Sequence, residues 1–250
     1  MSTTNKLSNI LITGANRGIG LGLVVEFAKC PDIQHIFACC RQPKQALELE
    51  QLQKSHSSIQ ILELDVSNDK SIADACKQVT KTVPYLNLLI NNAGICDQVE
   101  GVQVHKPDRD LFLRHFNVNT VGPVMVNGTF LPLLRNCLKV TSHPAIVINV
   151  SSEDGSISLC QGSYPLFSNN AAYGMSKAAL NHYSKALAFD EKEVIWIALD
   201  PGWVRTDMGK RDHAPLSVEE SCSETVKLVA ELQKKDSGRY VHTNGKTVPY

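Results

Sequence analysis

The sequence predicts a single α/β domain, in which about seven parallel strands form a sheet covered by helices on both faces. Two observations lead to this fold class. Short, continuous apolar runs alternate with amphipathic helical patterns almost to the end of the chain. No linker or repeat divides the 250 residues, and a hydrophobic content of 43% is enough for one large core.

The expected strands and helices alternate along the chain. The strands are the apolar runs at residues 9–13, 34–39, 59–64, 87–90, 145–150, 194–199 and 239–242. The helices are the patterns near residues 18–29, 43–54, 69–81, 108–138, 171–190 and 217–233. Ligands of such sheets bind beyond the carboxyl ends of the strands. Residues that directly follow a strand are therefore the first candidates for a site.

Composition and charge argue against several function classes. Lys and Arg together number 25, as do Asp and Glu, so no global field attracts nucleic acid or an anionic membrane. The first residues lack the apolar region of a secretory signal, and asparagines and prolines within residues 115–134 argue against a membrane span. The eight cysteines show neither C-x-x-C pairs nor zinc spacing. We expect a cytoplasmic protein without a metal, nucleic-acid or membrane partner.

A glycine-rich turn follows the first expected strand. Gly14, Gly18 and Gly20 give the spacing G-x-x-x-G-x-G, and Asn16, Arg17 and Ile19 lie between them. The next helix begins here, and a helix start offers unpaired N–H groups and the positive end of its dipole. Glycine lets a phosphate approach that backbone, so the turn predicts phosphate binding. A turn that uses glycine only for tight packing is the alternative.

Two further strand ends supply candidates for binding a nucleotide. Arg41 follows the second strand, where a carboxylate would accept hydrogen bonds from a ribose and an arginine can pair with a 2′-phosphate. With Arg17 as a second cation, the pattern favours NADPH over NADH. A solvated arginine is the alternative. Asp65 and Val66 follow the third strand and can bracket an adenine, although Asp65 could equally cap a helix.

Asparagines mark the fourth strand end and the helix after it. Asn92, Ala93 and Gly94 are small or polar residues that suit either a turn or a ligand site. Asn117 and Asn119 fall in a helical pattern where asparagine has poor propensity. Each either bonds to the backbone or serves a site.

The fifth strand runs into Ser151 and Ser152, and a Tyr-x-x-x-Lys pair opens the next helix. Residues four apart share a helical face, so the Lys177 ammonium can stand near the Tyr173 phenol. A nearby cation favours the phenolate and would move the tyrosine pKa from about 10 towards neutrality, as a proton donor to a carbonyl oxygen requires. Taken alone, the two residues could also be an ordinary surface pair.

Together these segments resemble the short-chain dehydrogenase/reductase family, and most closely its sniffer-type NADPH-dependent carbonyl reductases. The resemblance covers nearly the whole chain, and its motifs come in the family's order. It implies a Rossmann-type doubly wound parallel sheet. The motifs that carry it are Thr13 to Gly20, Asn91 to Gly94, Ser152 with Tyr173 and Lys177, Pro201 to Gly209, and Asn244 to Tyr250.

The resemblance also implies a role for each matching residue. Tyr173 would donate the proton, Lys177 would lower the Tyr173 pKa and bind the nicotinamide ribose, and Ser152 would hold the substrate carbonyl. Asn119, rather than Asn117, would order a water that leads protons to Lys177. The implied cofactor-binding residues are Gly14, Asn16, Arg17, Gly18, Ile19, Gly20, Arg41, Asp65, Val66, Asn92, Ala93, Gly94, Tyr173, Lys177, Pro201, Gly202, Val204 and Thr206.

Two loops are expected to form the walls of a substrate pocket. Residues 153–170 separate the serine from the tyrosine by more residues than is usual in the family, and residues 207–218 follow the nicotinamide contacts. The second loop could equally be an exposed linker, and the first leaves the number of subunits open, with a homodimer as one candidate. We expect NADPH-dependent reduction of an aldehyde, ketone or quinone. An NADP(H)-sensing interaction protein of the same fold is the alternative.

Overall fold

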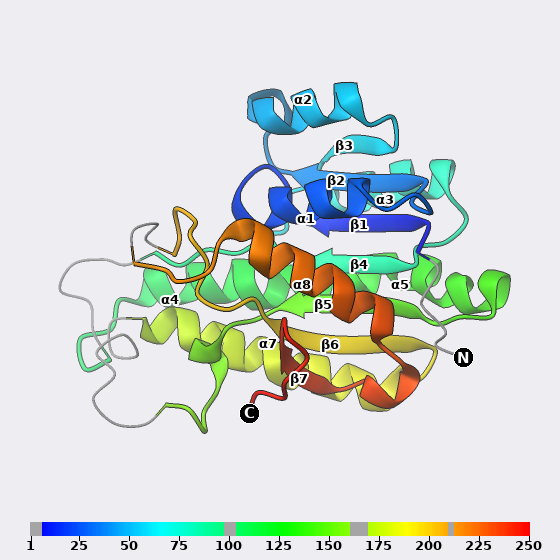
Figure 1. The fold of residues 1–250 in the computed structure, drawn as a ribbon. Helices are drawn as coiled ribbons and strands as arrows, with labels where there is room; N and C mark the ends of the chain where they lie inside the picture. The colour runs from blue at the N-terminus through cyan, green and yellow to red at the C-terminus, as the bar shows by residue number, and fades with distance from the viewer. Residues whose placement is uncertain (1–6, 98–103, 161–169, 210–212) are drawn as a thin grey trace.

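Seven strands form one parallel sheet in the order β3-β2-β1-β4-β5-β6-β7 (Figure 1). The structure is a computed structural model that describes residues 7–97, 104–160, 170–209 and 213–250. Every neighbouring pair in the sheet is parallel. The strands are β1 (Asn9–Thr13), β2 (His35–Cys40), β3 (Ile59–Glu63), β4 (Leu88–Asn91), β5 (Ala145–Val150), β6 (Val194–Asp200) and β7 (Arg239–His242).

The strand order reverses between β1 and β4. From β1 the chain first moves outward to β2 and β3, and it then returns to the other side of β1 to build β4 to β7 (Figure 1). This is a Rossmann-type doubly wound fold, as the sequence predicts. The reversal places the ends of β1 and β4 side by side, which is where such sheets bind ligands.

Helices cover both faces of the sheet. The α-helices are α1 (Gly18–Ala28), α2 (Leu47–Ser55), α3 (Asp69–Thr82), α4 (Arg109–Phe116), α5 (Gly122–Thr141), α7 (Ala171–Asp190) and α8 (Val218–Glu231). Short helical turns lie at η1 (Pro43–Gln45), η2 (Asn117–Val121), η3 (Glu153–Gly155) and η4 (Lys234–Asp236). No described helix combines the length and the apolar character that a membrane span needs.

Each face of the sheet has its own hydrophobic core because successive strand residues point to opposite sides. On one face, Ile10 and Ile12 pack with apolar residues of α1, α2 and α8. On the other, Leu11 packs with residues of α3 and α5 and with the fully buried Trp196. The strands between the two edge strands, β3 and β7, are buried on both faces over nearly all of their length, which explains their continuous apolar runs.

The helical pattern predicted near residues 108–138 is confirmed in extent, because residues 109–141 are helical throughout, but it is not one regular α-helix. The helix is interrupted at Asn117–Val121 by a π-helical turn that separates α4 from α5. A π turn fits an additional residue into the helix and locally widens it, and such turns are frequent at functional sites. Asn119 is the buried residue of this π turn.

Candidate active site

A cleft of about 1490 Å³ opens at the carboxyl ends of the strands. Its walls come from the segments that follow β1, β2, β3, β4, β5 and β6, together with α7. All but two of the predicted site residues line it. The exceptions are Gly20 and Asn119, which lie behind its walls. The lining residues are Gly14, Asn16, Arg17, Gly18, Ile19, Arg41, Asp65, Val66, Asn92, Ala93, Gly94, Ser152, Tyr173, Lys177, Pro201, Gly202, Val204 and Thr206.

The glycine turn presents backbone to the cleft. Gly14 has a φ of +63°, and a Cβ there would lie 2.8 Å from the Cα of Ala93. Both the backbone conformation and the lack of space therefore require glycine at this position. Gly20 serves packing instead, because a Cβ there would lie 2.2 Å from the carbonyl oxygen of Gly14. The packing alternative therefore describes Gly20, while Gly14 and Gly18 line the cleft.

The N-terminus of α1 is suited to an anion. No side chain caps it, and its first turn contains no acidic residue. Its first N–H groups and the positive end of the helix dipole therefore face the cleft without a carboxylate of their own. This second property supports phosphate binding independently of the glycine pattern.

Charged residues at this end of the cleft are exposed to solvent. Arg17 places Nη1 3.5 Å from Oδ2 of Asp207, and the two side chains are 70% and 56% exposed. Arg41 is exposed and lines the cleft beyond β2. Asp65 does not cap α3, because the cap is Asn68; its Oδ1 instead accepts from the Ser67 N–H at 2.9 Å. Both arginines remain available to a ligand phosphate.

The segment after β4 is fixed against the glycine turn. Asn92 donates through Nδ2 to the carbonyl oxygens of Thr13 at 2.9 Å and of Gly14 at 3.1 Å. The Thr13 hydroxyl accepts from the N–H groups of Asn92 and Ala93, both at 3.1 Å. Asn92, Ala93 and Gly94 thus form an irregular segment that is part of the cleft wall.

Asn119 is the buried asparagine of the π turn, whereas Asn117 is exposed. Its Oδ1 accepts from the Ile95 N–H at 2.8 Å, and its Nδ2 donates to the Ile95 carbonyl at 2.9 Å and to the Ser176 hydroxyl at 3.0 Å. Asn119 therefore joins the segment after β4 to helix α7. Ser176, which the sequence analysis missed, lies next to Lys177.

Tyr173, Lys177 and Ser152 meet in the cleft. The Lys177 Nζ lies 5.5 Å from the centre of the Tyr173 ring and donates to the Val150 carbonyl at 2.6 Å. Ser152 hydrogen-bonds to the Tyr173 side chain, and its hydroxyl accepts from the Asp154 N–H at 3.2 Å. The i, i+4 neighbours that the sequence predicts are thus brought against the end of β5, and Lys177 is only 4% exposed.

The expected lowering of the Tyr173 pKa is wrong for the protein as described. Burial raises this pKa well above its ordinary value, the charges of Cys96, Asp154 and Asp200 add to the increase, and the hydrogen bond with Ser152 opposes it. Burial also lowers the pKa of Lys177 to about 8. Tyr173 therefore keeps its proton at neutral pH beside a lysine that is still mostly cationic.

The segment after β6 forms the opposite wall of the cleft. The Thr206 N–H donates to the Val204 carbonyl at 2.8 Å, and the Thr206 hydroxyl accepts from the Gly209 N–H at 3.0 Å. Trp203 donates through Nε1 to the Gly209 carbonyl at 2.8 Å. Of the two expected pocket loops, residues 161–169 and 210–212 lie outside the described residues.

Sequence reasoning missed two residues that hold this end of the cleft. Asp200, the last residue of β6, accepts from the N–H groups of Glu153 and Gly202. Tyr240, on β7, donates through its hydroxyl to the Ser152 carbonyl. Asp200 could have been noticed as a charged residue that ends an apolar strand directly before Pro201. Tyr240 gives no comparable signal, because only the sheet order brings β7 near β5.

A glycine turn and a tyrosine–lysine pair that open into one cleft at the switch point of a parallel sheet are the arrangement of a nucleotide-dependent α/β oxidoreductase. The family can be named as well. The family model described as short chain dehydrogenase matches residues 8–216, and the chain belongs to this family, whose members use nicotinamide cofactors.

Solved structures and sequence relatives agree with this assignment. The carbonyl reductase Sniffer of Drosophila melanogaster is 36% identical with a TM-score of 0.91, over 98% of this chain and 100% of that one. The NADPH-bound carbonyl reductase from chicken fatty liver is 33% identical with a TM-score of 0.89, over the same shares. An uncharacterized oxidoreductase of Schizosaccharomyces pombe is 34% identical over the full length of both chains. The chain is therefore an oxidoreductase with carbonyl reductases among its structural neighbours.

Proposed function

We propose that the protein reduces a small carbonyl compound, an aldehyde, ketone or quinone, to an alcohol with NADPH. The observation that carries the proposal is the meeting of Ser152, Tyr173 and Lys177 in a cleft whose other end offers an uncapped helix N-terminus. The first three residues suit protonation of a carbonyl oxygen, and the helix end suits a pyrophosphate.

The residues of the cleft fit a dinucleotide. A Cβ at Gly14 would collide with Ala93, and one at Gly18, where φ is +55°, would lie 3.3 Å from Cγ2 of Thr206, so both glycines keep backbone open to the cleft. Arg17 and Arg41 are exposed cations that could pair with a 2′-phosphate. Asp65 and Val66 would border the adenine, and Pro201, Gly202, Val204 and Thr206 would hold the nicotinamide carboxamide.

Each catalytic residue then has a separate task. NADPH supplies the hydride that reduces the carbonyl carbon. Ser152 would hold the carbonyl oxygen, and the neutral Tyr173 would transfer its phenolic proton to that oxygen as negative charge develops there. The Lys177 cation would stabilise the phenolate that forms. Because the Tyr173 pKa is raised in the resting protein, the lysine acts on charge that appears during the reaction, which lowers the barrier more effectively than stabilising the starting state.

Several finer statements belong to the same proposal. We place the protein in the cytoplasm with a small-molecule substrate, and we assign the described parts of loops 153–170 and 207–218 to the substrate pocket. Leu159 and Met208 line the cleft from these loops and would give the pocket an apolar surface. Asn119, which holds Ile95 and Ser176 near Lys177, would support proton transfer from behind the wall.

The test is turnover of a panel of quinones, diketones and aldehydes with NADPH and, in parallel, NADH, followed by nicotinamide absorbance. We expect turnover that is faster with NADPH. Tyr173→Phe should keep NADPH binding and lose about 10²–10⁴-fold in kcat, since it removes the proton donor. Tyr183→Phe changes a tyrosine of the same helix that does not line the cleft and should leave kcat unchanged.

Each result bears on a separate part of the proposal. Unchanged turnover in Tyr173→Phe would remove the tyrosine from the mechanism. Turnover with NADH alone would overturn the cofactor assignment. Tight NADPH binding without turnover of any carbonyl would contradict the reductase and support an NADP(H)-sensing protein instead.

A further inference from the structure

Asp200 is an unusual carboxylate for its position. It ends the apolar strand β6, it is only 2% exposed, and it lines the cleft. Within the described part of the chain, it is the one ionisable residue with a buried side-chain oxygen, Oδ2, that makes no hydrogen bond. Burying a carboxylate without a partner for one of its oxygens costs free energy, so its presence at this position calls for a structural or functional role.

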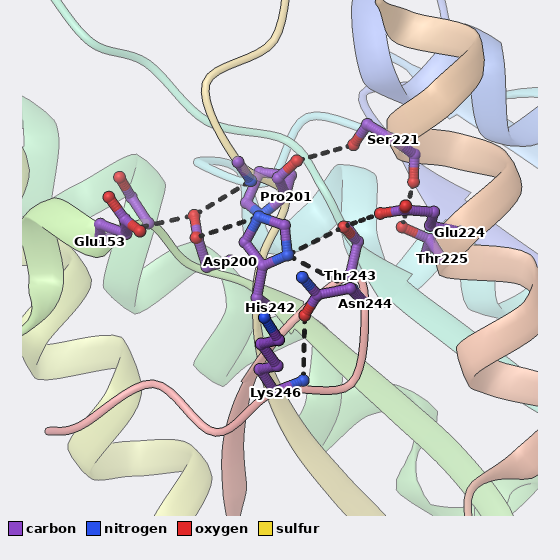
Figure 2. A network of polar contacts seen from close by, with 12 residues as sticks. Glu153, Asp200, Pro201, Ser221, Glu224, Thr225, His242, Thr243, Asn244 and Lys246 are labelled. Atoms are coloured by element: carbon purple, nitrogen blue, oxygen red, sulfur yellow. Dashed lines mark hydrogen bonds and ion pairs between the residues drawn. The ribbon is translucent and has the colours of Figure 1, made fainter. Parts of the chain in front are cut away.

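The other carboxylate oxygen joins two walls of the cleft. Oδ1 accepts from the Glu153 N–H at 3.3 Å and from the Gly202 N–H at 3.2 Å (Figure 2). Glu153 directly follows Ser152, and Gly202 begins the segment that leads to Val204 and Thr206. One oxygen therefore fixes the serine turn after β5 relative to the expected nicotinamide contacts after β6.

The free oxygen faces a histidine from the neighbouring strand. Asp200 and His242 are register partners of β6 and β7, and the His242 Nε2 lies 3.9 Å from Oδ2 (Figure 2). The Asn244 N–H lies 3.3 Å from Nδ1 of His242, so the imidazole is held between the turn after β7 and the carboxylate.

We propose that Asp200 is a positioning residue for carbonyl reduction: its ionised carboxylate sets the spacing between the Ser152 turn and the Pro201–Thr206 segment, and His242 keeps it ionised. This inference rests on the proposed function. The inference attributes the fall of kcat/KM at low pH to the titration of Asp200 beside His242. Neither residue is assigned a part in hydride or proton transfer.

The surrounding charges support this role. The pKa of Asp200 is raised to about 6: burial and the nearby Glu153 carboxylate raise it, and the two backbone donors and His242 partly oppose them. Tyr173 and Tyr240 also lie within electrostatic range of Asp200. On the far side of His242, Thr243 bridges to the Glu224 carboxylate, with its hydroxyl 2.8 Å from Oε2 and 3.2 Å from the His242 Nδ1.

The pKa of Asp200 determines the direction in which activity changes with pH. Above about pH 6 the carboxylate is ionised and makes two charge-assisted hydrogen bonds. Below that pH it becomes neutral, the bonds weaken, and the two walls lose their fixed spacing. A displacement of about 1 Å in an active site can reduce the rate by about 10²-fold.

The test measures kcat/KM for carbonyl reduction across pH in the wild type, in four variants of this network and in one control variant. We expect the wild-type value to fall roughly tenfold from about pH 7 to about pH 5, as titration of one group requires. Asp200→Asn keeps an acceptor oxygen without the charge, so its profile should be flat in this range. At about pH 7 Asp200→Asn should lose roughly tenfold, down to the level that the wild type reaches at low pH, and Asp200→Ala, which also lacks the acceptor oxygen, should lose up to about a hundredfold.

Two neighbouring variants provide a test that does not depend on altering Asp200. His242→Gln removes a group that lowers the Asp200 pKa and should move the acid limb to higher pH. Glu153→Gln removes a group that raises this pKa and should move the limb to lower pH. Asp74→Asn, the control, changes a surface carboxylate of α3 that pairs with Lys70 and Lys77, and it should leave the profile unchanged.

The possible failures are distinguishable. A wild-type enzyme that reduces no carbonyl overturns the proposed function and this inference with it. The inference alone is overturned if the wild type is active and Asp200→Asn keeps the acid limb at the same pH. It is also overturned if the acid limb shifts in the same direction in His242→Gln and Glu153→Gln. If Asp200→Asn does not fold, as judged by its thermal unfolding, the opposite shifts of the two neighbouring variants decide the question.

Discussion

The two ends of the cleft use charge in opposite ways. At the glycine turn the charged side chains are hydrated, and Arg17 is 70% exposed beside Asp207. At the other end Lys177 is 4% exposed and donates to the backbone of β5, and Asp200 is 2% exposed and accepts from the backbone N–H groups of Glu153 and Gly202. Hydrated charges are screened and contribute little, whereas buried charges interact strongly and shift their own pKa values.

This difference separates binding from chemistry. A mobile, solvated arginine can attract a ligand phosphate without holding a fixed position, because the phosphate itself is partly hydrated. Lys177 is held in place by the Val150 carbonyl and keeps its distance from the Tyr173 ring. We therefore expect substitutions at the buried end to change the rate and the pH dependence, and substitutions at the exposed end to change affinity by smaller factors.

The largest effect that follows from the comparison is at Lys177. Lys177→Met should reduce kcat for carbonyl reduction by about 10²–10³-fold, since it removes the cation that stabilises the developing phenolate. In the wild type, kcat/KM should fall as pH rises through about 8, because burial lowers the pKa of Lys177 to about 8 and the cation is lost above it. Steady-state kinetics across pH measure both effects.

The matched control for Lys177 lies on the same helix. Lys185 bonds to the Gly238 carbonyl and does not line the cleft, so Lys185→Met should keep both the rate and the pH profile. A wild-type profile that stays level well above pH 8 would contradict the assignment of the basic limb to Lys177.

The difference between the exposed and the buried end of the cleft also explains which features could be predicted from the sequence. Each strand was predicted to within one residue, because most of the strands are buried on both faces and therefore appear as continuous apolar runs. The closeness of Tyr173 and Lys177 was also predictable, since a spacing of four residues suffices. At the exposed end, the position of the candidate residues in the cleft could be predicted because each of them directly follows a strand.

The buried end was less predictable because its properties depend on contacts between distant segments. The direction of the Tyr173 pKa shift was wrong, since the degree of burial is set by segments that the local pattern does not contain. The π turn at Asn117–Val121 is invisible to a helical periodicity that continues on both sides of it. Asp200 becomes notable only when β6 brings it between Glu153 and His242.

A second prediction concerns the packing that connects the two ends. Gly122 begins α5 just after the π turn, and a Cβ there would lie 2.9 Å from Cβ of Val66, which lines the cleft near its exposed end. Gly122→Ala should lower the free energy of unfolding by about 1–3 kcal/mol through overpacking. Gly128, in the same helix, has open space where an added methyl group would lie, so Gly128→Ala should raise it by about 0.5–1 kcal/mol.

Denaturant unfolding of the two variants measures this difference directly. Because Val66 would move in Gly122→Ala, NADPH affinity should fall in that variant and stay constant in Gly128→Ala. Equal unfolding free energies in the two alanine variants would show that α5 and the Val66 segment do not pack as tightly as the structure places them.

The smallest expected effect lies at the exposed end, where Arg41 and Arg17 would share one 2′-phosphate. Arg41→Gln should raise the Kd for NADPH by roughly fivefold, which is about 1 kcal/mol, and leave the Kd for NADH unchanged. Added salt should weaken NADPH binding to the wild type more than to the variant, because the exposed pair is screened. Arg109→Gln, an exposed arginine at the start of α4 outside the cleft, is the control. If Arg41→Gln weakened NADH and NADPH equally, the arginine would act on the shared part of the two cofactors, and the selectivity for the 2′-phosphate would have to come from Arg17 alone.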